Sequence, residues 1–243
     1  MKNVEVIGTP AEFGQPRDLR ETVCVVFDVL RATSSIVTAL ANGTAGVLPV
    51  SEISEALVER KRHAGILLAG ERGGVRIRGA LTGGGDFDLG NSPREFTPEK
   101  VRGKTIVMTT TNGTRALRSC GGAKLVLVGS FLNLAATARR VRELSPENLL
   151  LVGSGTGEAE ALEDTLAAGA LVAELEAAVS PSAQRALEIF RKSRTLPEAM
   201  DDSVNGRRLL SNPDLREDVA FCLRRDVWDL TAVLDRHGAL VAG

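Results

Sequence analysis

Short runs of branched aliphatic residues alternate along this chain with segments whose apolar residues recur at helical spacing. Such alternation is typical of a sheet whose parallel strands are joined by helical crossovers, because a parallel connection must return across the sheet. We therefore predict an α/β fold with three layers (α/β/α) around a mostly parallel central sheet. Strands are expected at residues 22–27, 46–50, 66–69, 105–109, 125–128 and 149–152.

The segments between these strands predict helices at residues 33–41, 51–63 and 133–144. The first begins at a Thr/Ser cluster and stops at Asn42-Gly43, which are common start and stop signals. After Asp164 the pattern is predominantly helical to about Arg225, so we expect a helix-rich C-terminal part. No Ser/Gly/Pro linker divides the chain, and residues 1–243 are predicted to form a single domain.

The chain carries 30 basic and 31 acidic residues, a net charge of −1, without a basic run. Because no basic patch is available to meet a phosphate backbone, a nucleic-acid partner is not expected. The N-terminal residues lack the apolar stretch of a secretory signal, and the apolar segment 167–179 is interrupted by Glu174 and Glu176. We expect a soluble cytoplasmic protein that does not enter a membrane, and a homo-oligomer is compatible with the sequence.

Three cysteines, Cys24, Cys120 and Cys222, lie far apart and lack the paired C-x-x-C spacing of a zinc site. We interpret them as reduced thiols in the core. The gap between Cys24 and Arg31 is one residue longer than the phosphate loop of a cysteine phosphatase allows. Cys24 also lies in an apolar run, where a buried thiol would be protonated and unreactive.

The segment 153–157 (GSGTG) follows an expected strand, as a dinucleotide-binding loop would, but Glu158 stands at the position of the third glycine. A dinucleotide site is therefore not expected. With two histidines in the whole chain, a His-based metal cluster or a Ser-His-Asp triad has too few residues to draw on. Several other polar clusters follow expected strands, at the edge where open parallel sheets bind ligands.

Two of these clusters pair acidic and basic residues. Asp28 and Arg31 follow the strand at 22–27 and precede a helix start, where free backbone amides favour an anion. Glu71 and Arg72 lie in the segment GERGG, whose glycines allow the backbone to approach a ligand closely. An ordinary surface turn is the alternative interpretation of the second cluster.

Two further clusters are rich in hydroxyl and amide groups. A long glycine-rich loop ends in DFDLGNSP, which contains Asn91 and Ser92, and loops of this length are often functional. The strand at 105–109 leads through TTNGTR into a helical pattern, which argues against a hairpin turn. This segment brings together groups that can hold an oxyanion: Thr111, Asn112, Gly113, Thr114 and Arg115.

Glu163 and Asp164 open a helical stretch, where adjacent carboxylates either cap the helix or hold a metal ion. Capping alone would explain the pair. Asp28, Glu71 and Asp164 together, however, offer hard oxygen ligands, which suit Mg²⁺ far better than zinc or copper. We therefore predict a magnesium site with these three ligands.

Five segments of the chain form an ordered series: FDVLRATSSIVTALANG, LLAGERGG, FDLGNSP, GKTIVMTTTNGTRAL and LEDTLAAG. This series resembles the motifs of the 2-phosphosulfolactate phosphatases, magnesium-dependent enzymes of coenzyme M biosynthesis. The resemblance covers most of the chain, from about Val23 to about Cys222. It implies a three-layer α/β/α fold and hydrolysis of a small-molecule phosphoacid, 2-phospho-3-sulfolactate, to 3-sulfolactate and phosphate.

For such a reaction we expect the phosphate to lie between Mg²⁺ and residues 111–114, because phosphoryl transfer depends mainly on positioning and electrostatics. Asp28, Arg31 and Asn112 are the catalytic candidates. Either Arg31 or Arg115 would stabilise charge on the phosphoryl oxygens. The candidates for binding the substrate's carboxylate or sulfonate are Arg72, Asn91 and Ser92.

Two alternatives stay open. Asp28 can act as a nucleophile that forms an aspartyl-phosphate, as in phosphatases of the haloacid dehalogenase type. Leu30 and Ala32, however, stand where that class has a second Asp and a Thr. The other alternative is a non-catalytic anion-binding relative, which would be expected to have lost its metal-type carboxylates.

Overall fold

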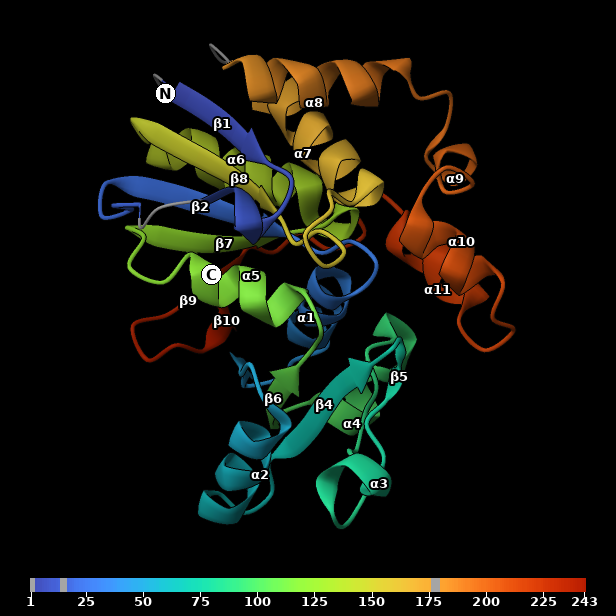
Figure 1. Cartoon of the computed structure of the whole chain (residues 1–243). Helices are drawn as coiled ribbons and strands as arrows, with labels where there is room; N and C mark the ends of the chain where they lie inside the picture. Colours follow the sequence, from blue (N-terminus) through green and yellow to red (C-terminus); the bar gives the residue numbers. More distant parts are fainter. Residues whose placement is uncertain (1–2, 14–16, 176–179) are drawn as a thin grey trace.

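The computed structural model describes residues 3–13, 17–175 and 180–243. Within these residues the strands form one ten-stranded sheet in the order β1-β8-β2-β7-β9-β10-β3-β6-β4-β5 (Figure 1). The strands are β1 (Asn3–Ile7), β2 (Thr22–Phe27), β3 (Gly46–Pro49), β4 (Leu67–Arg72), β5 (Val75–Arg76), β6 (Thr105–Thr109), β7 (Leu125–Gly129), β8 (Asn148–Gly153), β9 (Ala232–Leu234) and β10 (Leu240–Ala242).

Two parallel blocks make up most of this sheet. The first contains β1, β8, β2 and β7, and the second contains β3, β6 and β4. The hairpin β9–β10 pairs antiparallel with β7 on one side and with β3 on the other, so it joins the two blocks. The predicted α/β class with a mostly parallel sheet is confirmed. Each predicted strand is present, although β4 continues to Arg72 rather than ending at residue 69.

Strands β1, β5, β9 and β10 are absent from the predicted set. β5, β9 and β10 contain only two or three residues each, too few for an alternating hydrophobic pattern to show. The hairpin β9–β10 forms because the edges of β7 and β3 leave a place for it between the two blocks. That place exists only once the blocks are folded.

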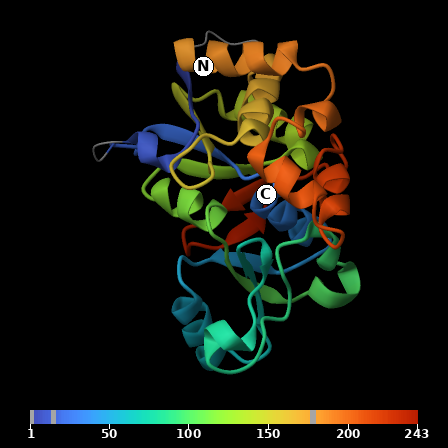
Figure 2. The same cartoon turned by 45° about the vertical axis from the view of Figure 1, so that its right-hand side comes forward.

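Helices cover both faces of the sheet (Figures 1 and 2). On one face pack α6 (Leu134–Leu144), α7 (Leu162–Leu175) and α8 (Pro181–Lys192). The other face is covered by α1 (Ala32–Ala41) and α5 (Gly113–Ser119). The remaining helices are α2 (Ile53–Arg62), α3 (Gly79–Thr82), α4 (Pro98–Val101), α9 (Leu196–Ala199), α10 (Val204–Leu210) and α11 (Arg216–Cys222), with 3₁₀ turns η1 (Pro10–Phe13), η2 (Pro93–Glu95) and η3 (Phe131–Asn133).

The predicted helices match α1, α2 and α6 closely. The stretch from Asp164 to about Arg225 is mostly helical, as predicted, and carries α7 to α11. Residues 176–179 of that stretch lie outside the described residues. In Figure 1 this C-terminal part runs from the top of the sheet, along α8 and α9, down to α10 and α11 beside α1.

β2 shows how one strand serves both layers of the core. All of its residues are buried. Val23, Val25 and Phe27 pack into the cluster on the side of α6, α7 and α8, whereas Cys24 and Val26 pack into the cluster on the α1 side. Because side chains alternate across a strand, consecutive apolar residues can fill both clusters.

The three cysteines are free and buried, as predicted. Cys24 lies in β2, and Cys222 ends α11. Burial raises the pKa of the Cys222 thiol to about 12, so this thiol stays protonated at neutral pH.

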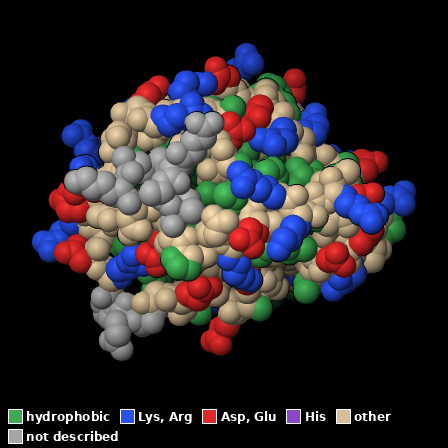
Figure 3. All heavy atoms as spheres, turned by 90° about the horizontal axis from the view of Figure 1, so that it is seen from above, with side chains coloured by type: hydrophobic (Ala, Val, Ile, Leu, Met, Phe, Trp, Pro, Cys, Tyr) green, Lys and Arg blue, Asp and Glu red, His purple; other side chains and the backbone are tan. Residues whose placement is uncertain are grey.

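Charges of both signs are mixed over the molecular surface seen in Figure 3, where Lys and Arg side chains are interspersed with Asp and Glu. On this face the described residues therefore present no large field of one sign. None of the described helices combines the length and the apolar character needed to cross a bilayer. The absence of a nucleic-acid partner and the oligomeric state stay predictions.

Gly169 allows α7 and α8 to pack closely, because a Cβ atom at this position would lie 2.2 Å from the backbone oxygen of Ala186. Gly169→Ala is expected to lower the free energy of unfolding by about 2 kcal/mol, since overpacking outweighs the helix propensity that Ala adds. Thermal unfolding followed by circular dichroism should show a Tm lower by roughly 4–8 °C. Gly84→Ala is the matched control, because nothing lies within 4 Å of a Cβ there. An unchanged Tm for Gly169→Ala would contradict the close packing.

Candidate active site

A pocket of ≈ 200 Å³ opens where the loops after β2, β4, β6 and β8 meet α7 and α10. Both parallel blocks of the sheet contribute the carboxyl ends of strands to it, which is where open α/β sheets bind ligands. Its charged lining side chains are Asp28, Glu71, Glu163, Arg31, Arg115 and Arg208, and its amide side chains are Asn91, Asn112 and Asn205. This small, polar pocket suits a small charged ligand.

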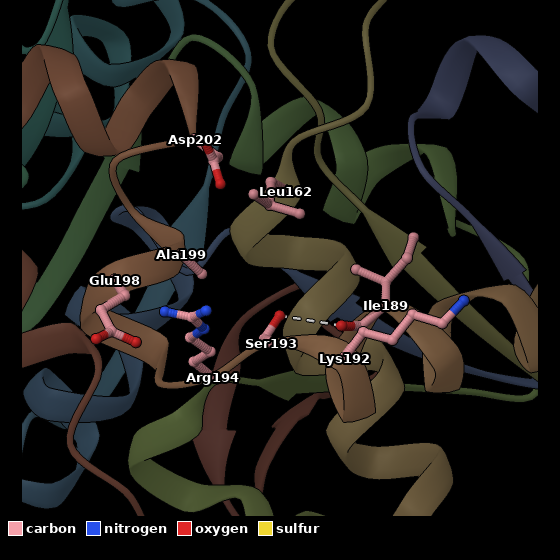
Figure 4. A pocket seen from close by; sticks show the side chains of 8 residues that line it. All are labelled: Leu162, Ile189, Lys192, Ser193, Arg194, Glu198, Ala199 and Asp202. Atoms are coloured by element: carbon pink, nitrogen blue, oxygen red, sulfur yellow. Dashed lines mark hydrogen bonds between the residues drawn. The ribbon is translucent and has the colours of Figure 1, made fainter.

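A larger cavity of ≈ 610 Å³ lies beside α7, the end of α8 and α9 (Figure 4). Its charged lining residues are Lys192, Arg194, Glu198 and Asp202, all of them exposed. In Figure 4, Lys192 extends away from Arg194 and Glu198, so these charges do not converge on one point. The cavity contains none of the residues that follow the strands, and we therefore place the candidate site in the smaller pocket.

Asp28 follows β2, is 7% exposed and lines the pocket. Its Oδ1 accepts a hydrogen bond from the backbone N–H of Ala32 (2.9 Å), and its backbone oxygen accepts one from the N–H of Thr33 (2.9 Å). The expectation that these amides of α1 are free for an anion is therefore wrong. Burial raises the pKa of Asp28 to about 6, and repulsion from Glu71 and Glu163 adds to the shift. A cation bound near these carboxylates would relieve that repulsion.

Glu71 ties together the loops after β4 and β6. Its Oε1 accepts hydrogen bonds from the backbone N–H and the hydroxyl of Thr111, at 2.7 and 2.8 Å. Its Oε2 accepts one from the backbone N–H of Gly74, at 2.7 Å. Thr110 and Thr114 each donate a backbone N–H to the other's hydroxyl oxygen. The TTNGT segment is thereby fixed beside the pocket, with Thr111 in the lining and Thr114 behind it.

Gly113 lets α5 approach the end of β2. A Cβ atom at this position would lie 2.6 Å from Asp28 Oδ2 and 2.6 Å from the Cβ of Ala32. The preceding residue, Asn112, is half-buried and lines the pocket, and its Oδ1 accepts a hydrogen bond from the N–H of Gly157 (3.4 Å). The glycine thus lets the start of α5, directly after Asn112, pack against Asp28.

Asp164 is 2% exposed and is not among the residues that line the pocket. Its Oδ1 accepts a hydrogen bond from the N–H of Val29 (2.8 Å), and its Oδ2 accepts bonds from the N–H and hydroxyl of Ser154 (both 3.0 Å). Burial raises the pKa of Asp164 well above its usual range, and the charges of Glu163 and Asp28 raise it further. These contacts suit a residue that holds the loops after β2 and β8 together.

Glu163, next to Asp164, does line the pocket, and it also anchors α10. Its Oε1 accepts a hydrogen bond from Nδ2 of Asn205 (2.8 Å), and its Oε2 accepts one from the hydroxyl of Ser203 (2.6 Å). Asn205 Nδ2 also donates to the hydroxyl of Thr156 (2.8 Å). These bonds dock α10 against the start of α7 and the loop after β8.

Arg31 is 3% exposed, lines the pocket and is held in place by α11. Its guanidinium donates to Oδ2 of Asp218 (2.7 Å) and to the backbone oxygen of Gly74 (2.6 Å). Asp218 Oδ1 accepts further hydrogen bonds from the hydroxyl of Ser92 (2.6 Å) and Nε of Arg94 (2.9 Å). Ser92, a predicted substrate-binding residue, thus supports the Asp218–Arg31 ion pair from outside the pocket lining.

Three other arginines differ in their partners. Arg72 donates to the backbone oxygen of Glu71 (2.7 Å) and the hydroxyl of Thr109 (3.0 Å), and it does not line the pocket. Arg115 and Arg208 do line the pocket and are exposed. Their guanidiniums make no hydrogen bond or ion pair with the residues that the structure describes, so they are available to an anion.

Asn91 is a buried member of the lining, 6% exposed. Its Oδ1 has no hydrogen-bond partner among the described residues. Because an unpaired buried polar atom is costly, such an atom marks a place where a ligand group or a water molecule binds. Of the predicted residues for the substrate's second acid group, Asn91 is the one that the structure places in the pocket.

Several lining residues are absent from the predicted set: Ser154, Gly155, Thr156, Gly157, Glu163, Asn205 and Arg208. The glycine-rich loop after β8 is visible in the sequence, but only as an incomplete dinucleotide motif. Whether Glu163 or Asp164 faces the pocket depends on the rotation of α7 about its axis. Asn205 and Arg208 show only a three-residue spacing, which any helix surface shares.

A magnesium ion would have to be held by few protein ligands. Among residues 3–13, 17–175 and 180–243, no three His, Cys, Asp or Glu side chains are grouped tightly enough to hold a metal ion. Asp28 and Glu71 both line the pocket, however, and Mg²⁺ is commonly bound by one or two carboxylates together with water and substrate phosphate. These two residues fit such a shared site, whereas Asp28, Glu71 and Asp164 do not form a ready-made cluster of three.

The comparisons with known proteins agree on one family. The family model for 2-phosphosulpholactate phosphatase matches residues 8–237. A probable 2-phosphosulfolactate phosphatase of Thermotoga petrophila is 43% identical over 212 residues, 86% of this chain and 88% of that protein. Proteins of the same name from Caldanaerobacter subterraneus and a Synechococcus species are 41% and 40% identical, over 90% and 89% of this chain and 90% of each relative. The chain therefore belongs to the 2-phosphosulfolactate phosphatase family.

Proposed function

We propose that this chain is a phosphoric monoester hydrolase that converts 2-phospho-3-sulfolactate to 3-sulfolactate and phosphate with the help of Mg²⁺. The observation that carries the proposal is the pocket, where Asp28 and Glu71 share one small volume with the unpaired guanidinium of Arg115. Oxygen ligands for a cation and free donors for anions are the two requirements of phosphoryl transfer. The family and the names of its members support the substrate.

Arg31 and Arg115 have different electrostatic roles in this proposal. Arg31 is fixed by Asp218 and Gly74, so it can stabilise charge on the phosphoryl oxygens without reorganising. Arg115 is exposed and free, so it can meet the incoming phosphate. In the reaction a water oxygen bonds to phosphorus, the ester P–O bond breaks, and its electron pair leaves on the sulfolactate oxygen, which takes up a proton.

Asp28 and Glu71 would hold Mg²⁺, and the ion would neutralise phosphate charge. Glu71 also holds the TTNGT segment through Thr111, so cation binding and phosphate binding are mechanically connected. Asn112 lies in the same pocket lining and has an Nδ2 that can donate to a phosphoryl oxygen. Asp164 keeps the loops around Asp28 in place.

Particular residues argue against the two alternatives, an aspartyl-phosphate mechanism and a non-catalytic relative. In aspartyl-phosphate mechanisms of the haloacid dehalogenase type, a second Asp two residues after the nucleophile transfers the proton, but here that position is Leu30, which cannot do so. A non-catalytic relative would have no reason to keep Asp28 and Glu71 buried in a polar pocket, where burial of their charge costs stability. The first observation favours direct attack of water over an aspartyl-phosphate, and the second favours a catalytic protein over a non-catalytic one. A cytoplasmic location and a place in coenzyme M biosynthesis stay predictions.

Removal of divalent cations with EDTA is expected to abolish phosphate release from 2-phospho-3-sulfolactate, and added Mg²⁺ should restore it. Mg²⁺ alone should raise the Tm of the protein, because an ion that binds only the folded state stabilises it. Asp28→Asn should lose both the activity and the Mg²⁺-induced rise in Tm. Asp18→Asn, at an exposed carboxylate that does not line the pocket, should keep both. Full turnover in excess EDTA would rule out the metal.

Asn112→Ala is expected to lower kcat by at least about tenfold, because it removes a hydrogen-bond donor that stabilises the transition state by roughly 1.4 kcal/mol. Its Tm should stay close to that of the wild type, since among the described residues the side chain loses one long hydrogen bond, from the N–H of Gly157 (3.4 Å). Asn212→Ala is the control, because the Asn212 side chain accepts a hydrogen bond from the nearby N–H of Asp214 (3.0 Å) and does not line the pocket. If Asn112→Ala is folded and has unchanged kinetics, the TTNGT segment is a structural turn.

The role of Asp28 is expected to show in the stereochemistry at phosphorus. A phosphorothioate substrate made chiral with ¹⁶O and ¹⁸O and hydrolysed in H₂¹⁷O should give inorganic thiophosphate of inverted configuration, because a single attack by water reverses the configuration at phosphorus. Attack by Asp28 followed by hydrolysis would reverse it twice and give net retention. Mass spectrometry of acid-quenched enzyme should accordingly find no phosphoryl group on the Asp28 peptide. Retention, or a trapped acyl-phosphate, would establish Asp28 as the nucleophile.

A further inference from the structure

α10 carries one arginine into the pocket and one away from it. Asn205 and Arg208 are three residues apart and therefore lie on the same face of the helix, and both line the pocket. Arg207 does not line the pocket, and its Nη1 donates to the backbone oxygen of Asp201 (2.7 Å). Adjacent side chains of the same type thus have different environments, which makes Arg207 a matched control for Arg208.

The position of Arg208 is determined by how α10 is anchored. Glu163 accepts hydrogen bonds from Ser203 and Asn205, and the hydroxyl of Ser203 also accepts the N–H of Gly206 (2.9 Å) at the start of the helix. With its first turn fixed in this way, α10 holds Arg208 over the turn between β4 and β5. There, Cζ and Nη2 of Arg208 lie 4.0 Å from the place where a Cβ of Gly74 would be.

The backbone of Gly74 also contacts two charged residues of the pocket, Arg31 and Glu71. Its backbone oxygen accepts the bond from Arg31, and its N–H donates to Glu71. Arg208 therefore lies over the same turn that Arg31 and Glu71 contact, and these two residues belong to the proposed phosphate and metal sites. Unlike Arg31, whose charge is balanced by Asp218, Arg208 has no ion-pair partner among the described residues.

The pocket thus has more anion-binding capacity than one phosphate requires. Arg31 and Arg115 can serve the phosphoryl group, which leaves the guanidinium of Arg208 for a second anion. The unpaired, buried Oδ1 of Asn91 is an independent sign that a ligand group belongs in this pocket. A half-turn of this amide exchanges its oxygen for Nδ2, which would donate to an acid group.

We propose that Arg208 is a specificity residue, which binds an acid group of the substrate that is not transferred. The substrate class is a phosphomonoester with a second acid group, a sulfonate or a carboxylate, whose planar or tetrahedral oxygens match the donors of a guanidinium. This inference rests on the proposed function. It gives Arg208, on α10, the role that the sequence predicted for Arg72 and Ser92.

Binding of the two products separates this role from phosphate binding. Isothermal titration calorimetry measures the Kd of 3-sulfolactate and of inorganic phosphate for the wild type, Arg208→Gln and Arg207→Gln. Arg208→Gln is expected to weaken 3-sulfolactate binding by about 10- to 100-fold, because charge-assisted hydrogen bonds are lost. It should leave phosphate binding unchanged. Arg207→Gln should change neither. Equal Tm values would show that all three proteins are folded.

Kinetics give a second measurement with three substrates: 2-phospho-3-sulfolactate, 2-phospholactate without the sulfonate, and propan-2-yl phosphate without either acid group. Arg208→Gln should lower kcat/KM for the first by about 10- to 100-fold and leave it unchanged for the last. The result with 2-phospholactate identifies which acid group Arg208 binds. Equal losses for all three substrates, or weaker binding of phosphate, would overturn the proposal and place Arg208 at the phosphoryl group.

Failure of the proposed function has a different signature. A wild type that releases no phosphate from any of the three substrates but binds 3-sulfolactate through Arg208 would disprove the hydrolysis and retain the specificity residue. Normal phosphate release with an unaffected Arg208→Gln variant would disprove the specificity residue alone. A wild type with neither turnover nor 3-sulfolactate binding would overturn both.

Discussion

Buried carboxylates that accept backbone N–H groups hold the loops of this protein in place. Asp164 binds the N–H groups of Val29 and Ser154, which follow two neighbouring strands of the first parallel block. Glu71 does the same for the loops of the second block, through Thr111 and Gly74. Each carboxylate loses hydration when it is buried, and these hydrogen bonds offset part of that cost. The pocket depends on these contacts because much of its wall consists of loops, which lack the regular backbone hydrogen bonds of a sheet or helix.

The same contacts concentrate charge. Asp28 lies close enough to Glu71 and Glu163 for their repulsion to raise its pKa, in addition to the effect of burial. On the cationic side, Arg31 is neutralised by Asp218, while Arg115 and Arg208 are not paired within the described residues. A protein gains little stability from such an arrangement, which is typical of a functional site. The groups become balanced only when a cation and an anion enter together, as a phosphoester with its metal would.

The helix-rich C-terminal part completes the pocket from a distance in sequence. α11 supplies Asp218, which fixes Arg31, and α10 supplies Asn205 and Arg208. Glu163 links this region to the sheet through its bonds to Ser203 and Asn205. Side chains that are up to 180 residues apart in the chain, from Asp28 to Arg208, therefore line one pocket.

The sequence by itself determined the class of the fold and the strand ends that carry the chemistry. A continuous apolar run such as β2 is buried on both faces when the sheet has helices on both sides. The local sequence pattern was therefore sufficient to predict the α/β class. Polar residues at or just after strand ends, among them Asp28, Glu71 and Asn112, had to meet at the carboxyl edge, because parallel strands share that edge. The hairpin β9–β10 could not be seen, since its short strands are stabilised by neighbours rather than by their own pattern.

Only the tertiary structure decided which of the clustered residues face the pocket. Arg72 and Glu71 are adjacent in β4, and alternation along a strand sends their side chains to different partners. Glu163 and Asp164 are adjacent in α7, and the rotation of that helix turns one toward α10 and the other toward the loops. Arg208 enters from a helix that no local motif connects with the sheet. Side-chain direction depends on how elements are rotated and docked, and those quantities are set by packing between segments far apart in the chain.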